Sequence, residues 1–338
     1  MSEEIDKFNC NMNRRHFLSK TSLGLGAFSL ASLLNPKTLF SNQRDPFKGA
    51  LDAPHVLPKA KRVIYLFQSG GPSQHDMFDY KPKLEEMHGQ DLPPSVLGDQ
   101  RLTGFTASQD ALPLAGSRFK FSRHGKNGAW VSDLLPYTGD VADELCFIKT
   151  VYTGAINHDP AVTFFQTGVE TPGLPSMGSW VSYGLGSDNE NLPAFSVLLS
   201  RSAATVQPLS SRLWSSGFIP SLHQGVQYRA GKDPVLNLTN PDGFDSMSRR
   251  DMLSSLTDLN QYHLDEYGDP EVSSRIAQYE MAYRMQTSVP ETMDLSDEPE
   301  STYALYGEDA RTPGTYAANC LLARRLAERD VKFVQLYH

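Results

Sequence analysis

Two polar segments of the sequence carry side chains that could hold a metal ion or an anion. The first, residues 68–79, contains Ser69, His75 and Asp76 together with the pair Gly70-Gly71. Hydroxyl, imidazole and carboxylate groups suit a divalent metal such as zinc or calcium, and glycines let the backbone approach a ligand closely. We expect Asp76 and His75 to ligate a metal and Ser69 to contact an anion. The alternative is a solvated loop in which Asp76 caps a turn.

The second segment, residues 157–168, places a histidine beside an expected helix start. Asp159 is a good N-cap and Pro160 a good first helical residue, so His158 would lie at the positive end of a short helix. Because such an end attracts anions, His158 could ligate a metal or contact a sulfate or phosphate, with Asn157 and Asp159 beside it. The alternative is that His158 is an ordinary solvated or structural histidine.

Short apolar runs predict the strands that would position these segments. Residues 62–67 and 145–151 precede the two polar segments, and residues 194–199 form a third such run. An unalternating run of β-branched and aromatic residues is typical of a strand buried on both faces of a parallel sheet, so we expect residues 62–67 to form a central strand. Residues 161–167 and 177–185 are expected to form short helices between the strands.

The later part of the chain has the apolar spacing of helices. Residues 80–130 show little periodicity and are expected to be long connections with short helical pieces. A helical insertion is expected at about 245–290, where Asp269 supplies an N-cap. Residues 312–329 predict another helix, and residues 331–337 predict a last strand. Strands that alternate with helices indicate an α/β fold, a doubly wound, mostly parallel sheet with helices on both faces.

The amino-terminal residues have the pattern of an export signal. Arg14 and Arg15 precede a weakly apolar stretch over residues 23–34, which is the pattern of a twin-arginine signal. Twelve residues cover only about 18 Å as a helix, short of the roughly 30 Å hydrocarbon core, so no stable membrane span is expected. We interpret residues 1–44 as signal peptide and linker and 45–338 as one domain, exported by the twin-arginine translocase to the periplasm or cell surface.

The composition of the chain limits the classes of partner that it is expected to bind. The chain has 31 basic and 39 acidic side chains and a net charge of −8. Nucleic acids are bound by clustered positive charge, so we expect no nucleic-acid partner. Beyond the signal segment the only cysteines are Cys146 and Cys320. Both lie in apolar stretches, and we expect them to be buried free thiols.

Several motifs together resemble a known family. The segment around His158 is similar to the sulfatase signature, in which a nucleophile is followed by a proline and then by a Thr-Gly pair; here His158, Pro160 and Thr167-Gly168 occupy those places. Most of the chain resembles the exported domain-of-unknown-function family 1501 (DUF1501), within the alkaline phosphatase and sulfatase superfamily. The segments that carry this resemblance are VIYLFQSGGPSQHDMFDYKP, INHDPAVTFFQTG, PSMGSWVSYGLGSDNENLPAF and VKFVQLYH.

This resemblance implies an alkaline-phosphatase-like α/β fold with a metal-centred site that acts on sulfate or phosphate esters. Asp76 would be the metal ligand that follows the first strand, and His158 would occupy the position of the catalytic nucleophile. Two departures stand out. Gln68 and Ser69 occur where the superfamily has an acidic ligand, and a histidine replaces the usual cysteine, serine or threonine. A phosphohistidine-like route or attack by a metal-activated water would then replace the usual covalent intermediate.

Members of the family continue past the VKFVQLYH strand with further metal ligands, so we expect this chain to be a carboxy-terminally truncated fragment. Three hypotheses follow. The first is an exported sulfate or phosphate ester hydrolase with a divalent metal. The second is a non-catalytic exported protein on the same fold that binds a sulfated polymer or a protein partner. The third is that the chain, lacking neighbours for its last strand, does not fold stably.

Overall fold

The structure is a computed structural model that describes residues 47–104, 106–201, 209–231, 234–236, 238–241, 243–267 and 269–338. The expected export signal with Arg14 and Arg15 lies outside the described residues. Within them, none of the helices combines the length and the apolar character needed to cross a membrane.

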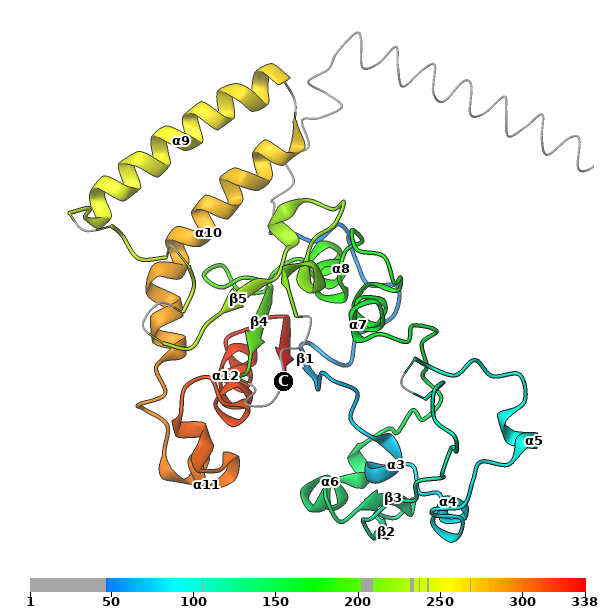
Figure 1. Ribbon diagram of the computed structural model, residues 1–338. Coiled ribbons are helices and arrows are strands. Elements are labelled where there is room, and N and C mark those ends of the chain that lie inside the picture. The colour runs from blue at the N-terminus through cyan, green and yellow to red at the C-terminus, as the bar shows by residue number, and fades with distance from the viewer. Residues whose placement is uncertain are drawn as a thin grey trace, which may run out of the picture.

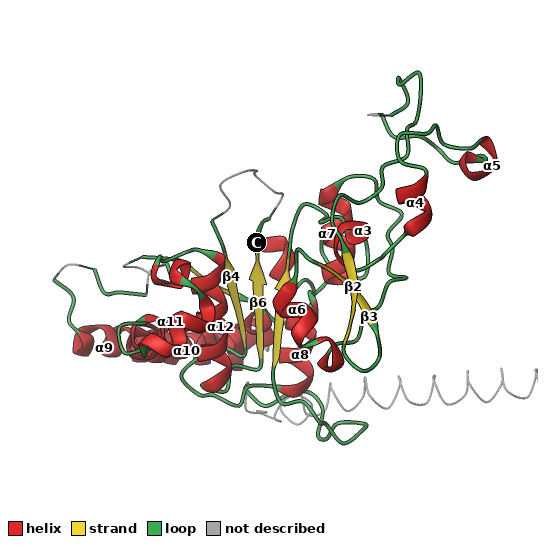
Figure 2. Cartoon of the chain, turned by 90° about the horizontal axis from the view of Figure 1, so that it is seen from below, coloured by secondary structure: helices red, strands yellow, loops and turns green. Residues whose placement is uncertain are grey.

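Four parallel strands form the central sheet. They lie in the order β1 (Val63–Phe67), β6 (Phe333–Tyr337), β4 (Phe195–Leu199) and β5 (Val226–Tyr228). Figure 2 shows the strands pointing the same way, with the carboxyl terminus at their tips. All five residues of β6 are buried because this strand pairs on both sides. The expected mixed α/β class with a parallel sheet is therefore confirmed.

Strand β1 lies at an edge of this sheet, so the expectation of a central strand buried on both faces was wrong. Val63, Ile64 and Leu66 are each more than 40% exposed. Within the described residues β1 pairs with β6 alone. An apolar run shows that a segment suits a sheet, but the number of neighbouring strands is decided by parts of the chain far away in the sequence.

Helices cover both faces of the sheet. On one face α12 (Tyr316–Glu328) and α10 (Pro270–Met293) pack against the strands through side chains such as Leu326 and Met285. On the other face α7 (His158–Thr167) contributes Val162, which packs with Phe333 and Tyr337 of β6. Successive strand side chains point to opposite faces, which explains why Phe333 and Tyr337 lie on the α7 side, whereas Val334 and Leu336 lie on the other.

The remaining elements lie around this core or in a separate lobe (Figure 1). Their bounds are α3 (Gln74–Met77), α4 (Pro82–Glu86), α5 (Pro94–Leu97), β2 (Phe121–His124), β3 (Ala129–Ser132), α6 (Pro136–Asp140), α8 (Met177–Leu185), α9 (Ser246–Tyr267) and α11 (Glu300–Tyr306). The described residues also form single turns of 3-10 helix, which are η1 (Ala142–Glu144), η2 (Ser211–Trp214), η3 (Ser221–His223) and η4 (Glu308–Arg311).

Helices α8, α9 and α10 lie where the sequence places them. The Asp269 carboxylate accepts a hydrogen bond of 2.9 Å from the backbone N–H of Glu271, which confirms the expected N-cap of α10. Helix α10 contributes Met281, Met285 and Val289 to the core, whereas α9 buries no residue.

Helix α12 begins at Tyr316, with Thr315 as its N-cap, a few residues later than expected. The Thr315 hydroxyl accepts from a backbone N–H of the first turn, which decides the start.

Residues 145–151 do not form the expected strand. Leu145, Ile148 and Val151 are 43–69% exposed, and this segment pairs with no described strand. Cys146 is exposed rather than buried, and Cys320 is half-buried. A run of β-forming residues becomes a strand only where a neighbour satisfies its backbone groups, and the described residues supply none here.

Residues 121–132 form an antiparallel hairpin that the sequence pattern did not indicate. Strands β2 and β3 pair in register, and Gly125 and Gly128 in the connecting turn both have positive φ. The Asp143 carboxylate accepts hydrogen bonds from the backbone N–H of Lys126 at 2.8 and 2.9 Å and thereby fixes the turn. The hairpin, α3, α4 and α6 make up a lobe that we call the hairpin lobe (Figure 1).

Candidate functional site

The carboxyl ends of β1 and β6 meet at one edge of the sheet and carry polar residues. Ser69 follows β1, and its backbone N–H donates to the carbonyl of His338 at 2.7 Å, while its hydroxyl donates to the same oxygen. The Gln68 amide donates to the Tyr316 hydroxyl at 2.8 Å, and burial raises the pKa of Tyr316 to about 12. Loops beyond the carboxyl ends of parallel strands are where α/β proteins bind ligands.

Helix α7 runs antiparallel to β1, so its first turn lies toward this edge. The Gln166 side chain, near the end of α7, donates to the Tyr65 hydroxyl at 3.3 Å in the middle of β1. Phe165 packs on Phe67, with ring centroids 5.9 Å apart, and Val162 packs with Tyr337 at the end of β6. Val162 lies four residues after His158, and four residues of helix rise about 6 Å. Because Val162 is already level with the end of β6, the turn that begins at His158 extends beyond the strand ends.

An arginine from a distant part of the chain reaches the first turn of α7. Arg212 lies in η2 and forms an ion pair with the Asp159 carboxylate. Trp214, also in η2, packs on Tyr337 with ring centroids 5.7 Å apart, and this contact holds η2 at the carboxyl edge. The Arg212 side chain is 30% exposed and that of Asp159 51%, so the pair is open to solvent.

The structure changes the expected helix start at this position. Asn157 is the N-cap of α7 and His158 its first residue, so Asp159 lies in the first turn and is not the cap. An acidic residue there is stabilised by the partial positive charge of the helix end, and Arg212 adds a full positive charge. Both the helix end and the guanidinium favour the binding of an oxyanion. Such an anion would have to compete with the Asp159 carboxylate for Arg212.

The expected metal ligands lie in the hairpin lobe, in and beside α3. His75 accepts or donates a hydrogen bond of 3.2 Å between Nδ1 and the Ser73 hydroxyl, and its Nε2 lies 3.9 Å from the Asp76 carboxylate. Hydrogen bonds from Ser117 and then from Ser73 lower the pKa of Asp76 below its ordinary value. The Asp76 carboxylate is therefore held in the ionised form that a metal requires.

These two side chains do not complete a metal site by themselves. The described residues contain no group of three or more His, Cys, Asp and Glu side chains placed to hold one ion. The crevice that His75 and Ser117 line has a volume of about 10 Å³, the lower limit for holding one water molecule. Zinc in structural sites takes four ligands and calcium six to eight, so the described residues fall short of either.

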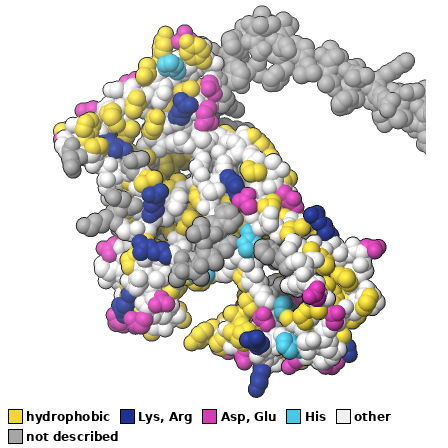
Figure 3. Space-filling model, in the orientation of Figure 1, with side chains coloured by type: hydrophobic (Ala, Val, Ile, Leu, Met, Phe, Trp, Pro, Cys, Tyr) yellow, Lys and Arg dark blue, Asp and Glu magenta, His cyan; other side chains and the backbone are white. Residues whose placement is uncertain are grey.

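The expected site residues thus fall into three places. Asn157, His158 and Asp159 share the first turn of α7, Ser69 lies at the end of β1, and His75 and Asp76 lie in the hairpin lobe. Figure 1 shows α3 in that lobe, apart from α7, and Figure 3 shows the surface hollowed between the lobe and the part that carries α11.

Arg212 is the group that sequence reasoning missed. It lies 53 positions from its partner Asp159 in a serine-rich stretch with no periodic pattern, so no local signal marks it. Gln166 and Gln335 were missed as well; they form a buried hydrogen bond of 2.6 Å between α7 and β6. Gln335 within the apolar run of β6 was the available signal, because a buried amide needs a partner.

Comparison with known proteins identifies a family that covers most of the chain. The model of a family described as "Protein of unknown function (DUF1501)" matches residues 60–338. No curated protein and no solved structure matches the chain.

Proposed function

The chain belongs to the DUF1501 family, and from that premise we propose that it is an exported hydrolase of sulfate or phosphate esters with an alkaline-phosphatase-like fold. The observation that carries the proposal is the position of Arg212 beside the first turn of α7, at the carboxyl edge of a parallel sheet. This arrangement offers an anionic ester a guanidinium and the positive end of a helix together.

In this proposal the chain's own groups bind and attack the ester. Arg212 and the first backbone N–H groups of α7 hold its nonbridging oxygens, with Asn157 and Ser69 at the margin. A nitrogen of the His158 imidazole bonds to phosphorus or sulfur while the bond to the ester oxygen breaks, and the departing alcohol takes up a proton from water. Water then cleaves the nitrogen bond, releasing phosphate or sulfate and restoring the imidazole.

A divalent metal, calcium or zinc, belongs to the proposal and would supply Lewis-acid chemistry when bound. His75 and Asp76 would hold it together with ligands that the described residues do not supply.

We further propose that the chain reaches the periplasm or cell surface through the twin-arginine translocase, by means of Arg14 and Arg15. That pathway carries folded proteins, so a metal could be loaded before export.

The second candidate function is a non-catalytic exported protein on the same fold that binds a sulfated polymer or a protein partner. One observation favours it: the Ser69 hydroxyl is bound to the His338 carbonyl, so the hydroxyl next to β1 already has a structural partner. Metal analysis of protein exported to and purified from the periplasm separates the two. The hydrolase should retain stoichiometric metal, whereas the binder need not.

Hydrolysis of 4-nitrophenyl sulfate and 4-nitrophenyl phosphate tests the proposal. We expect release of 4-nitrophenol by the exported wild-type protein, loss of activity with a chelator, and at least about a hundredfold lower rate in His158→Ala. His263→Ala is the matched control, because His263 is exposed on α9. A rate unchanged by both His158→Ala and Asp76→Ala would contradict the assignment.

A further inference from the structure

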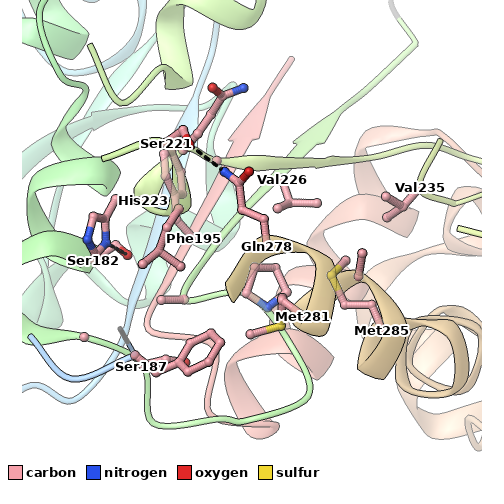
Figure 4. Close-up of a pocket in the computed structure, with 18 of the residues that line it drawn as sticks. Ser182, Ser187, Phe195, Ser221, His223, Val226, Val235, Gln278, Met281 and Met285 are labelled. Atoms are coloured by element: carbon pink, nitrogen blue, oxygen red, sulfur yellow. Dashed lines mark hydrogen bonds between the residues drawn. The ribbon is translucent and has the colours of Figure 1, made fainter. Parts of the chain in front are cut away.

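A second cavity lies at the opposite end of the sheet from the candidate site. Its volume is about 470 Å³, within the range of small-molecule sites. Phe195 and Val226, the first residues of β4 and β5, line it, so it opens at the amino ends of these strands. Helices α8 and α10 and the turn η3 form the other walls (Figure 4).

The walls are mostly apolar. Met281 and Met285 project from α10 toward Phe195, Val226 and Val235 (Figure 4). Methionine side chains are flexible and polarisable, and they adapt to ligands of different shape. A cavity of this size and lining attracts an apolar molecule, because burial removes the apolar surface of that molecule from water.

A neutral histidine supplies one polar point on the wall. His223 Nδ1 lies 2.9 Å from the Ser182 hydroxyl, and both side chains are more than 90% buried. Burial lowers the pKa of His223 to about 4, so the ring is uncharged near neutral pH. In either tautomer Nε2 keeps one hydrogen-bonding position, which no described residue occupies.

A second polar point comes from α10. The Gln278 amide donates to the Ser221 hydroxyl at 3.0 Å, and Ser221 in turn donates to the Glu271 carboxylate. This chain of bonds fixes the amide of Gln278 at the centre of the cavity wall (Figure 4). Among the described residues nothing donates to its carbonyl oxygen, which is therefore open to a ligand that carries a donor.

The charges of the lining residues decide which class of ligand the cavity can bind. Among the described residues, those that line the cavity include no lysine, arginine, aspartate or glutamate. A charged ligand would lose its hydration without meeting an opposite charge, which is costly in an apolar site. We propose that this cavity is a binding site for an uncharged, predominantly apolar small molecule that carries one hydroxyl or amine N–H group, which donates to Gln278.

Catalysis by the Ser182–His223 pair is not part of this proposal. The imidazole is too weak a base near neutral pH to activate a serine, and no carboxylate of the described residues orients its second nitrogen. The inference is also independent of ester hydrolysis, since the two sites lie at opposite ends of the sheet.

Fluorescence titration with two matched probes tests the proposal on the full chain. The first probe is N-phenyl-1-naphthylamine, an uncharged aromatic amine, and the second is 8-anilinonaphthalene-1-sulfonate, the same ring system with a sulfonate. We expect saturable binding of the uncharged probe at one site and at least about tenfold weaker binding of the anionic probe. Equal affinity for the two probes, or no saturable binding of the first, would overturn the proposal.

Two substitutions test whether the uncharged probe binds in this cavity. Ala282→Phe fills the wall from α10, and we expect at least about tenfold weaker binding of the uncharged probe than in Ala304→Phe, an exposed control on α11. Because a new phenyl group could disturb α10, Leu236→Trp provides a second test. Leu236 lines the cavity but is 57% exposed, and Leu305→Trp is its exposed control. Undiminished binding in folded Leu236→Trp would refute the location.

Discussion

The buried His223 should make the fold sensitive to acid. The residue is 7% exposed, and burial lowers its pKa from 6.5 to about 4. Because the folded pKa lies below the unfolded one, the unfolded chain takes up the proton first. Stability is therefore intact above pH 6.5 and falls as the pH drops from there toward 4. The perturbation that tests this is His223→Gln, which keeps a hydrogen-bonding group near Ser182 but cannot titrate.

The magnitude follows from the two pKa values. A tenfold difference in proton affinity corresponds to about 1.4 kcal/mol, so full protonation costs roughly 3 kcal/mol of stability. At about pH 5 the unfolded histidine is almost fully protonated and the folded one hardly at all. Linkage then gives a loss of about 2 kcal/mol between about pH 7 and about pH 5.

Urea unfolding at the two pH values measures this loss. We expect the wild-type free energy of unfolding to fall about 2 kcal/mol more than that of His223→Gln over this interval. His263→Gln, at an exposed position on α9, should follow the wild type. Equal losses in the wild type and in His223→Gln would show that His223 is not held neutral by burial.

Three further predictions concern stability and are checked by the same unfolding assay. A Cβ at Gly178 would lie 2.6 Å from the ring of the first residue of β4, so Gly178→Ala should cost about 1–3 kcal/mol. Gly184→Ala, in the same helix with its nearest contact at 3.6 Å, should instead stabilise by about 0.5–1 kcal/mol. Arg325→Met should cost about 3 kcal/mol, because it removes a buried guanidinium from Glu298, which then keeps Arg324 as its ion-pair partner. A more stable Gly178→Ala or a less stable Gly184→Ala would contradict this interpretation of the packing. So would a loss in the free energy of unfolding below about 1 kcal/mol for Arg325→Met.

Elements with strong local signals could be predicted from the sequence. Helix α8 lies at the expected residues, and α10 begins at the expected Asp269 cap, because capping groups act within a few residues. Strands β4 and β6 were recognisable because their apolar runs are buried on both faces. The same pattern at residues 145–151 failed, since a strand also needs a partner, and that is a property of the whole chain.

The candidate site could be predicted only in part, for the same reason. Pro160 and the surrounding polar residues indicated a helix start, and His158 does lie in the first turn of α7. Arg212 arrives through the packing of Trp214 on Tyr337, a contact between segments more than a hundred residues apart. Local spacing in the sequence indicates neither the position of Arg212 nor the separation of His75 and Asp76 from α7.

The central claim is that the first turn of α7 and Arg212 form an oxyanion site. Its most direct test is calorimetric titration with inorganic sulfate and phosphate at low ionic strength, for the wild type, Arg212→Gln and the exposed control Arg123→Gln. A charge-assisted hydrogen bond contributes about 1.5–3 kcal/mol, so Arg212→Gln should bind at least about tenfold more weakly, while the control binds like the wild type. Equal binding by all three proteins, or no binding by the wild type, would contradict the claim.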